Sequence, residues 1–377
     1  MIARSIRASI ALVLLASQVG AETSAPVSID GARRALASGD AAKAVTIYES
    51  LTQQGESLEA ELGLVRASLQ AGEFRKAVSW ATLTAGEHTD SSEAVALLAY
   101  LHDRAGYTEQ ALQTLKQLRA DRPDDPMAAA ALATVLMDRG GKASAADEAA
   151  SRKWPRPAFQ AIPAEKRHVI AGGNGIIVDG GRHVLTYSAV LPKAAASIYV
   201  RNGLGKVRRA VREAGDQHGE LVRLKIAEPY PAAWALPKDQ IASPDGVRFC
   251  FAFGYSASSD LDGGYPAISP GLVFRADAGT GGLMQITSAL GAGHIGSPVF
   301  DPRGRLLGLS VGNGAITIDG ENIRSRVGSG QFAVRAVAAQ PASGIPPRPS
   351  GPLPPMPAIE ELYERLAPSI VQIVSVQ

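Results

Sequence analysis

The feature that most constrains this chain is a glycine that recurs at nearly constant steps through its first half. The steps are 33, 34 and 34 residues, and an alanine follows each glycine after five residues. The glycines are Gly39, Gly72, Gly106 and Gly140, and the alanines are Ala44, Ala77, Ala111 and Ala145. Apolar residues between them recur at helical spacing. Such a period predicts stacked helical hairpins, each of which turns at its glycine.

A 34-residue period with a small residue in the turn resembles the tetratricopeptide repeat, and residues 28–150 are therefore expected to form a helical superhelix. The alternative is an unrelated alanine-rich bundle. Pro123 and Pro126 should end the helix of the third unit, and the fourth unit, with its Gly140-Gly141, is typical of a degraded terminal repeat. Repeats of this family offer a concave groove, so the resemblance implies a protein or peptide partner bound there.

The pattern changes after Trp154, Pro155 and Pro157, which end the helical periodicity and predict a linker at residues 151–158. Short strands between glycine-rich turns follow, as in an all-β barrel or sandwich. The expected fold class is thus a multidomain α + β chain, with a helical superhelix before an all-β domain at residues 159–338.

Ordered segments of this second domain resemble HtrA-like serine proteases of the trypsin fold, which have a double β-barrel. GNGIIVDGGRHVLTYSAVL resembles the segment that ends in the catalytic histidine, and GELVRLKI resembles the strand that carries the aspartate. QITSALGAGHIGSPVF resembles the nucleophile turn and keeps Gly293, Gly296 and Pro298. GRLLGLSVG and QFAVRA resemble the strands that follow the nucleophile turn.

All three triad positions depart from the family pattern. Ala189 stands in the place of the general base, Glu220 in that of the orienting acid, and Ile295 in that of the nucleophile. Isoleucine has no lone pair for attack, and loss of triad members as a unit costs about a millionfold in turnover. The resemblance therefore implies a protease fold without serine chemistry, in which Glu220 is a surface acid or a member of an ion pair.

Other catalytic or ligand-binding sets find little support. Ser297 and His294 share the nucleophile turn, and His183 precedes the strand expected to carry the base, but a displaced Ser–His site would require a rebuilt turn. His88, His102, His168 and His218 lack the spacing of metal ligands. Gly173, Gly175 and Gly203 are followed by no Walker-type lysine. We expect no cofactor and no metal.

The ends of the chain predict targeting and a spacer. Arg4 and Arg7 precede an apolar run and small residues, so residues 1–21 resemble a secretory signal cleaved after Ala21. Cleavage would leave 36 basic and 36 acidic residues, from 38 and 36 in the whole sequence. This balance argues against nucleic acid as a partner, and no stable membrane insertion is expected after cleavage. Cys250, the one cysteine, is expected to be a buried thiol.

The last 39 residues leave two alternatives open. Residues 339–357 are proline-rich and predict an extended spacer. Residues 358–377 resemble the lead-in helix and first strand of HtrA-like domains, which normally open such a domain. The segment either completes the barrel of its own chain, as in a circular permutation, or begins a second protease domain beyond this sequence.

Together these features predict a secreted, periplasmic scaffold or adaptor that binds protein or peptide partners through its repeats and a catalytically inactive trypsin-like domain. The alternative is a serine endopeptidase, acting through an unrecognised site or through a second protease domain.

Overall fold

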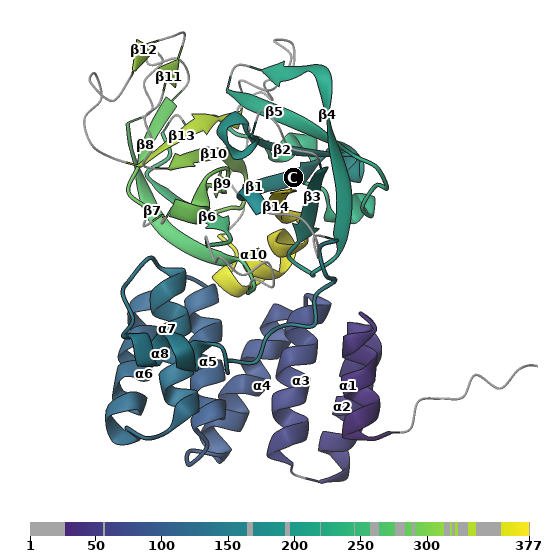
Figure 1. Ribbon diagram of the computed structural model, residues 1–377, viewed down its shortest axis with the longest axis vertical. Coiled ribbons are helices and arrows are strands. Elements are labelled where there is room, and N and C mark those ends of the chain that lie inside the picture. The colour runs from purple at the N-terminus through teal and green to yellow at the C-terminus, as the bar shows by residue number, and fades with distance from the viewer. Residues whose placement is uncertain are drawn as a thin grey trace, which may run out of the picture.

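The computed structural model shows a helical layer beneath two β-barrels (Figure 1). It describes residues 27–55, 57–163, 169–192, 197–218, 220–244, 246–256, 264–275, 283–288, 290, 292–312, 317–318, 321–322, 331–336 and 356–376. The expected signal at residues 1–21 and nearly all of the expected spacer at residues 339–357 lie outside these ranges.

The helices of the first half come in consecutive pairs. They are α1 (Ile29–Ala37), α2 (Ala41–Gln54), α3 (Leu58–Ala71), α4 (Phe74–Glu87), α5 (Ser92–Arg104), α6 (Thr108–Asp121), α7 (Pro126–Asp138) and α8 (Ala145–Ser151). Each repeat glycine lies between the helices of a pair with a positive φ, from 73° to 94°, a conformation that glycine adopts without penalty. The predicted helical region is thus present, and the break between α6 and α7 falls at the expected prolines.

The repeat alanines are buried in the first three pairs and exposed in the fourth. Ala44, Ala77 and Ala111 are fully buried where helices cross, so a larger side chain would push the helices apart. The short α8 has no buried residue, and its Ala145 is exposed. The last pair therefore keeps the glycine-alanine spacing without the packing that the alanine makes in the other pairs.

The turns of the repeats face the barrels, which gives the glycines a second role. A Cβ on Gly72 would lie 2.9 Å from Leu204 Cδ2, and one on Gly106 would lie 3.3 Å from the carbonyl oxygen of Ile268. The Lys206 ammonium donates to the carbonyl of Gly39 at 2.9 Å. The glycine edge of the helical layer is therefore the surface on which the barrels rest.

The first barrel is closed in the order β1-β14-β3-β4-β5-β2. Its strands are β1 (Val169–Val178), β2 (His183–Tyr187), β3 (Ser197–Asn202), β4 (Val207–His218), β5 (Leu221–Ile226) and β14 (Ile370–Val376). The short helical turns η1 (Asp179–Gly181) and η2 (Ser188–Val190) flank β2.

The C-terminal strand β14 lies inside this barrel, between β1 and β3. Ile373 is opposite Gly173 on one side and Val200 on the other, and every residue of β14 is buried. Helix α10 (Ile359–Leu366) precedes it and packs on α4. Of the two alternatives for residues 358–377, the structure has the arrangement in which the segment closes the barrel of its own chain.

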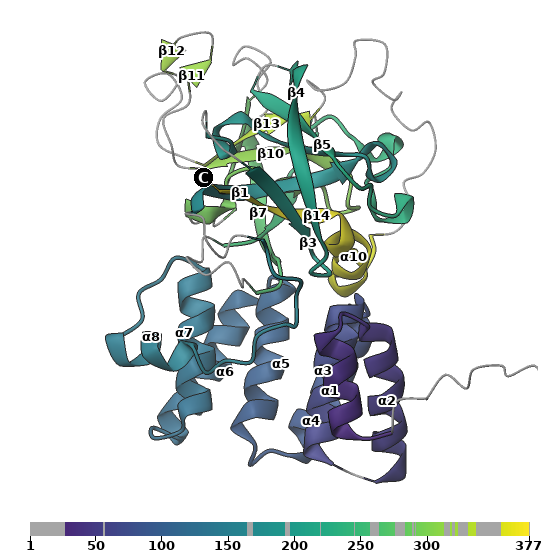
Figure 2. The ribbon, with the colours of Figure 1, turned by 45° about the vertical axis from the view of Figure 1, so that its right-hand side comes forward.

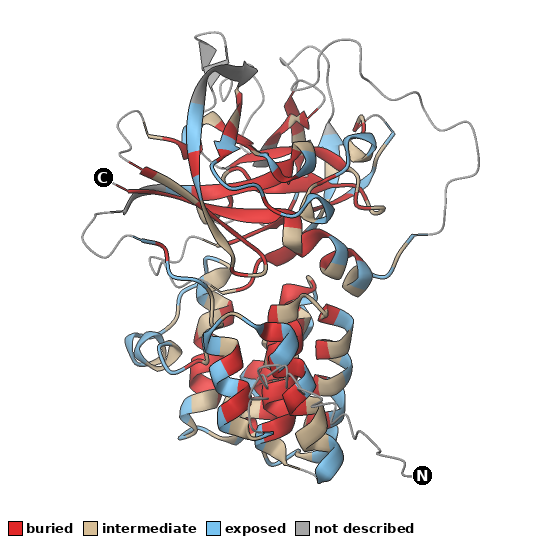
Figure 3. Cartoon of the chain, turned by 90° about the vertical axis from the view of Figure 1, so that its right-hand side faces the viewer, coloured by how far each residue is buried: buried red, intermediate tan, exposed pale blue. Residues whose placement is uncertain are grey.

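The second barrel is closed in the order β10-β13-β8-β7-β6-β9. Its strands are β6 (Phe249–Gly254), β7 (Ala267–Arg275), β8 (Leu283–Ile286), β9 (Pro298–Phe300), β10 (Leu306–Gly312) and β13 (Gln331–Arg335), and β11 (Thr317–Ile318) pairs with β12 (Glu321–Asn322). Cys250 is buried in β6, and burial raises the pKa of its thiol to about 11. Buried residues fill both barrels and the interior of the helical layer (Figure 3).

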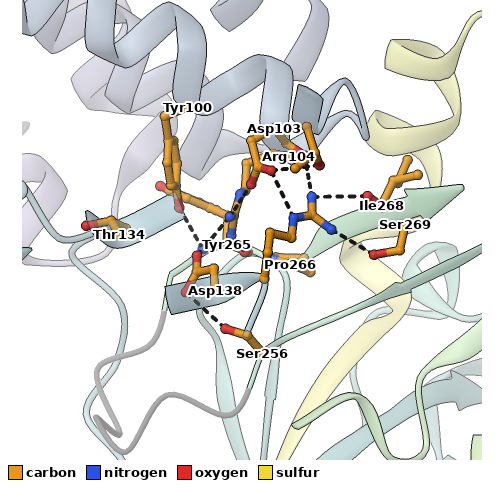
Figure 4. Close-up of polar contacts among 12 residues, drawn as sticks. Tyr100, Asp103, Arg104, Thr134, Asp138, Ser256, Tyr265, Pro266, Ile268 and Ser269 are labelled. Atoms are coloured by element: carbon orange, nitrogen blue, oxygen red, sulfur yellow. Dashed lines mark hydrogen bonds and ion pairs between the residues drawn. The ribbon is translucent and has the colours of Figure 1, made fainter. Parts of the chain in front are cut away.

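A buried network of charges joins the helical layer to the second barrel (Figure 4). Arg104 is 2% exposed; it pairs with Asp138 at 2.8 Å and donates to the carbonyl of Tyr265 at 2.9 Å. Arg139 Nε pairs with Asp103 at 2.9 Å, and its Nη1 donates to Ser269 Oγ at 2.7 Å. The ion pairs thus lie within the helical layer, and their two arginines donate hydrogen bonds to the second barrel.

Candidate functional site

The turn predicted to replace a nucleophile turn lies where the two barrels meet. It comprises η6 (Ala292–His294), Ile295, Gly296 and the start of β9. The N–H of Asn174, in β1 of the first barrel, donates to the carbonyl of Ile295 at 2.7 Å. The N–H of Gly296 donates to the carbonyl of Ser310, in β10 of the second barrel, at 2.8 Å. The turn is thus bound to a strand of each barrel.

Asn174 fixes this turn from the first barrel. Its side chain is fully buried. Nδ2 donates to the carbonyls of Gly293 at 2.7 Å and Tyr255 at 3.1 Å, and Oδ1 accepts from the Tyr255 N–H at 2.7 Å. Sequence reasoning missed this residue, because a single asparagine between two glycines carries no signal for three long-range hydrogen bonds.

The glycines around Asn174 permit close approach and serve no phosphate loop. A Cβ on Gly173 would lie 2.6 Å from Val190 Cγ2 and 2.8 Å from the carbonyl oxygen of Ile295. One on Gly296, whose φ is 79°, would lie 2.1 Å from the carbonyl oxygen of Asn174. Contacts this short leave no space for a side chain.

The elements that carry the three triad positions converge on this point. Ala189 is exposed in η2, and its neighbour Val190 touches Gly173 from one side while Ile295 touches it from the other. Glu220 accepts from the backbone N–H of Ser188 at 2.9 Å through its carbonyl, and from Ser188 Oγ at 3.3 Å through its carboxylate. The structure thus brings the elements that carry Ala189, Glu220 and Ile295 to one place between the barrels.

The chemistry available there is limited by these residue types. Ala189 cannot take a proton, and Ile295 is half-buried and apolar. Burial, together with the charge of Glu220 and a hydrogen bond to it, raises the pKa of Tyr187 to about 12, so this phenol stays neutral at pH 7. Ala189 and Ile295 therefore supply neither a base nor a nucleophile at their two positions.

The structure does not make Ser297 an accessible nucleophile. Ser297 is 0% exposed, and a Cβ on Gly254 would lie 2.2 Å from its Oγ, so the hydroxyl faces the backbone of β6. His294 is buried in the same turn, and its carbonyl accepts from Ser310 Oγ. His183 is at the far end of β2, where Nδ1 lies 3.1 Å from Asp179. The structure thus does not bring His183 to the turn.

Residue types that bind metals gather in one place among the described residues, and it lies in the helical layer. Single atoms of Glu61, Glu87 and His88 lie within 4.8 Å of one another. Glu61 Oε2 and His88 Nε2 are 3.3 Å apart. These residues join α3 to α4, so they are separate from the turn between the barrels.

Comparison with known proteins agrees with the fold of the second half. Residues 173–309 match the family model for the trypsin-like peptidase domain. No curated protein matches this sequence. The match covers less than half of the chain, so it describes one domain. The helical half lies outside the matched residues.

Solved structures similar to this chain include HtrA-type proteases. The serine endoprotease from Yersinia pestis is 18% identical over 44% of this chain and 54% of its own, with a TM-score of 0.34. The MamO protease domain from Magnetospirillum magneticum is 22% identical over 45% of this chain and 88% of its own, also with a TM-score of 0.34. The chain therefore spans about half the length of the Yersinia protein.

Proposed function

We propose that this chain is a non-catalytic binding protein, in which the helical repeats and the trypsin-like domain together form a scaffold or adaptor for extended protein segments. The observation that carries the proposal is the turn at residues 292–298. Its backbone is held by Asn174, Ser310 and the close approach at Gly296. The resemblance to the HtrA-like nucleophile turn puts Ile295 in the place of the serine.

A binding role agrees with what the fold retains. Peptide recognition by strand addition uses backbone hydrogen bonds and pockets, and requires no general base. Helical repeats bind extended segments along their inner face without any chemistry of their own. Both modes therefore survive the loss of a triad.

A secreted, periplasmic location is part of the proposal, and it rests on the residue order of positions 1–21. Among the described residues, no helix is both long and apolar enough to cross a membrane. Measuring the mass of the protein recovered from the periplasm of an expressing bacterium tests the location. A chain that begins at Glu22 supports it, and a chain retained with residue 1 in the cytoplasm contradicts it.

The catalytic question is tested with a fluorophosphonate probe and unfolded casein. Wild-type protein, a Ser297→Ala variant and trypsin as a positive control are incubated with each. We expect labelling and cleavage by trypsin only. Labelling of wild type that disappears in Ser297→Ala would favour the alternative, a serine endopeptidase with a rebuilt site, because the buried Ser297 would then have to reach the probe.

A further inference from the structure

The segment that joins the helical repeats to the barrels lies on the repeats themselves. After α8 it crosses α5 and then rises to the first barrel, as Figures 1 and 2 show. Trp154 is 7% exposed, and its ring centroid lies 5.5 Å from that of Tyr100 in α5. A segment predicted as a linker thus buries an aromatic anchor in the helical layer.

Gln70 in α3 binds the backbone of the same segment at Ala158, four residues after Trp154. Its Nε2 donates to the carbonyl of Ala158 at 3.0 Å, and the N–H of Ala158 donates to its Oε1 at 3.0 Å. Gln70 is itself 6% exposed. A primary amide that satisfies both groups of one residue recognises an extended backbone without regard to its side chain.

The segment has the composition of a preorganised ligand. Pro155 and Pro157 hold φ and restrict the residues before them to extended conformations, so little conformational entropy is lost on binding. Phe159 lies against the barrels: its ring is edge-on to Tyr265 with centroids 5.0 Å apart, and the guanidinium of Arg201 lies over it. The sequence from Trp154 to Phe159 therefore has an aromatic residue at each end and prolines between them.

We propose that α3 and α5 form a binding groove for extended peptides in which a tryptophan is followed by prolines, and that the chain's own residues 154–158 occupy it. The inference rests on the proposed binding function and specifies its ligand. A tethered segment has an effective concentration of about millimolar, so a partner with the same contacts is excluded until the segment leaves. In the intact chain, an external peptide must therefore compete with this segment for the groove.

The experiment measures binding of a fluorescein-labelled peptide with the sequence of residues 152–163 to the full-length protein by anisotropy. In the Trp154→Ala variant the internal segment loses its anchor while the groove is unchanged. We expect this variant to bind the peptide at least tenfold more tightly than wild type does. Adding Gln70→Leu should abolish the gain, and Trp234→Ala, which removes a tryptophan of the barrel, should leave binding at the wild-type level.

A peptide in which the tryptophan is replaced by alanine controls for attraction by its basic residues, and it should bind at least tenfold more weakly. The inference is wrong if folded Trp154→Ala protein binds the peptide no better than wild type, or if the tryptophan-free peptide binds equally well. If Trp154→Ala does not fold, Pro155→Gly/Pro157→Gly loosens the segment without touching the anchors and must give the same gain. Fluorophosphonate labelling would refute the non-catalytic function alone, whereas a failed titration refutes the groove alone.

Discussion

At the residue scale, the turn between the barrels depends on glycines at positions where no side chain would fit. Gly296 combines a positive φ with a Cβ position 2.1 Å from a carbonyl oxygen. The assignment of the three triad positions stays a prediction, and this glycine could be predicted from the motif. Asn174 and Ser310 could not, because their role depends on hydrogen bonds to residues 81 to 119 positions away for Asn174 and 13 to 16 positions away for Ser310.

Replacing Gly296 with alanine should destabilise the protein by about 2–4 kcal/mol, from the cost of a left-handed conformation together with overpacking. Gly180→Ala is the matched control, since Gly180 has a φ of 64° but no atom within 4 Å of an added Cβ. It should cost about 1 kcal/mol. Urea denaturation of both variants measures the difference. Equal losses would show that the approach to Asn174 does not constrain the turn.

Asp103 should make stability depend on pH at the acid end. Burial works to raise its pKa, but the charges of Arg104 and Arg139 outweigh burial, so its pKa is lowered. The folded value is then below the unfolded value of about 3.9. The stabilisation is fully present above about pH 4 and is lost as the pH falls through the folded pKa.

Asp103→Asn should therefore cost about 3 kcal/mol at pH 7, since it takes the carboxylate from Arg139 and leaves the buried Arg104 with Asp138 alone. The loss should shrink when urea denaturation is repeated at pH 3, because this pH is below the unfolded pKa of about 3.9 and part of the stabilisation is then lost in wild type. Asp121→Asn, at an exposed carboxylate of α6, is the control and should change little. A constant loss from pH 7 to pH 3 would contradict the assignment.

At the scale of elements, the sequence period and the alternation of residue types predict helices and strands, which depend on neighbouring residues. The glycine period predicted the helical pairs, and alternating strands predicted the barrels. The location of β14 stayed open, because an apolar strand such as Ile370–Val376 can pair as well in its own barrel as in another domain. The placement of residues 154–159 was missed, since prolines predict an extended segment but not the surface on which it lies.

The position of β14 can be tested by one buried side chain. Ile373 is 0% exposed between β1 and β3, so Ile373→Ala should lower the free energy of unfolding by about 3 kcal/mol. Ile359→Ala in α10 is the control, because Ile359 is half-buried and should cost about 1 kcal/mol. Unfolding followed by far-UV circular dichroism compares them. No loss for Ile373→Ala would return this segment to the alternative of a further domain.

At the scale of the whole molecule, the helical layer and the barrels are joined at several places. The charge network joins α5 and α7 to the second barrel, and Phe74 of α4 stacks on Tyr363 of α10 with centroids 3.9 Å apart. Arg75 forms a bidentate pair with Glu364. Domain interfaces within a chain are usually smaller and more polar than cores, but here buried aromatic and charged groups are shared.

We therefore expect the two parts to unfold in one transition. Separation of the two parts would take from Arg104 its acceptor at Tyr265 and from Arg139 its acceptors at Ser269 and Ile268. Loss of hydrogen bonds from charged groups is costly. Differential scanning calorimetry of wild type should then give one peak with equal calorimetric and van't Hoff enthalpies. Arg139→Ala removes the hydrogen bonds to Ser269 and to the carbonyl of Ile268, so it should separate the peak into two. Arg33→Ala, at an exposed ion pair of the helical layer, should leave one peak, and two peaks in wild type would show that the helical layer and the barrels are thermodynamically independent.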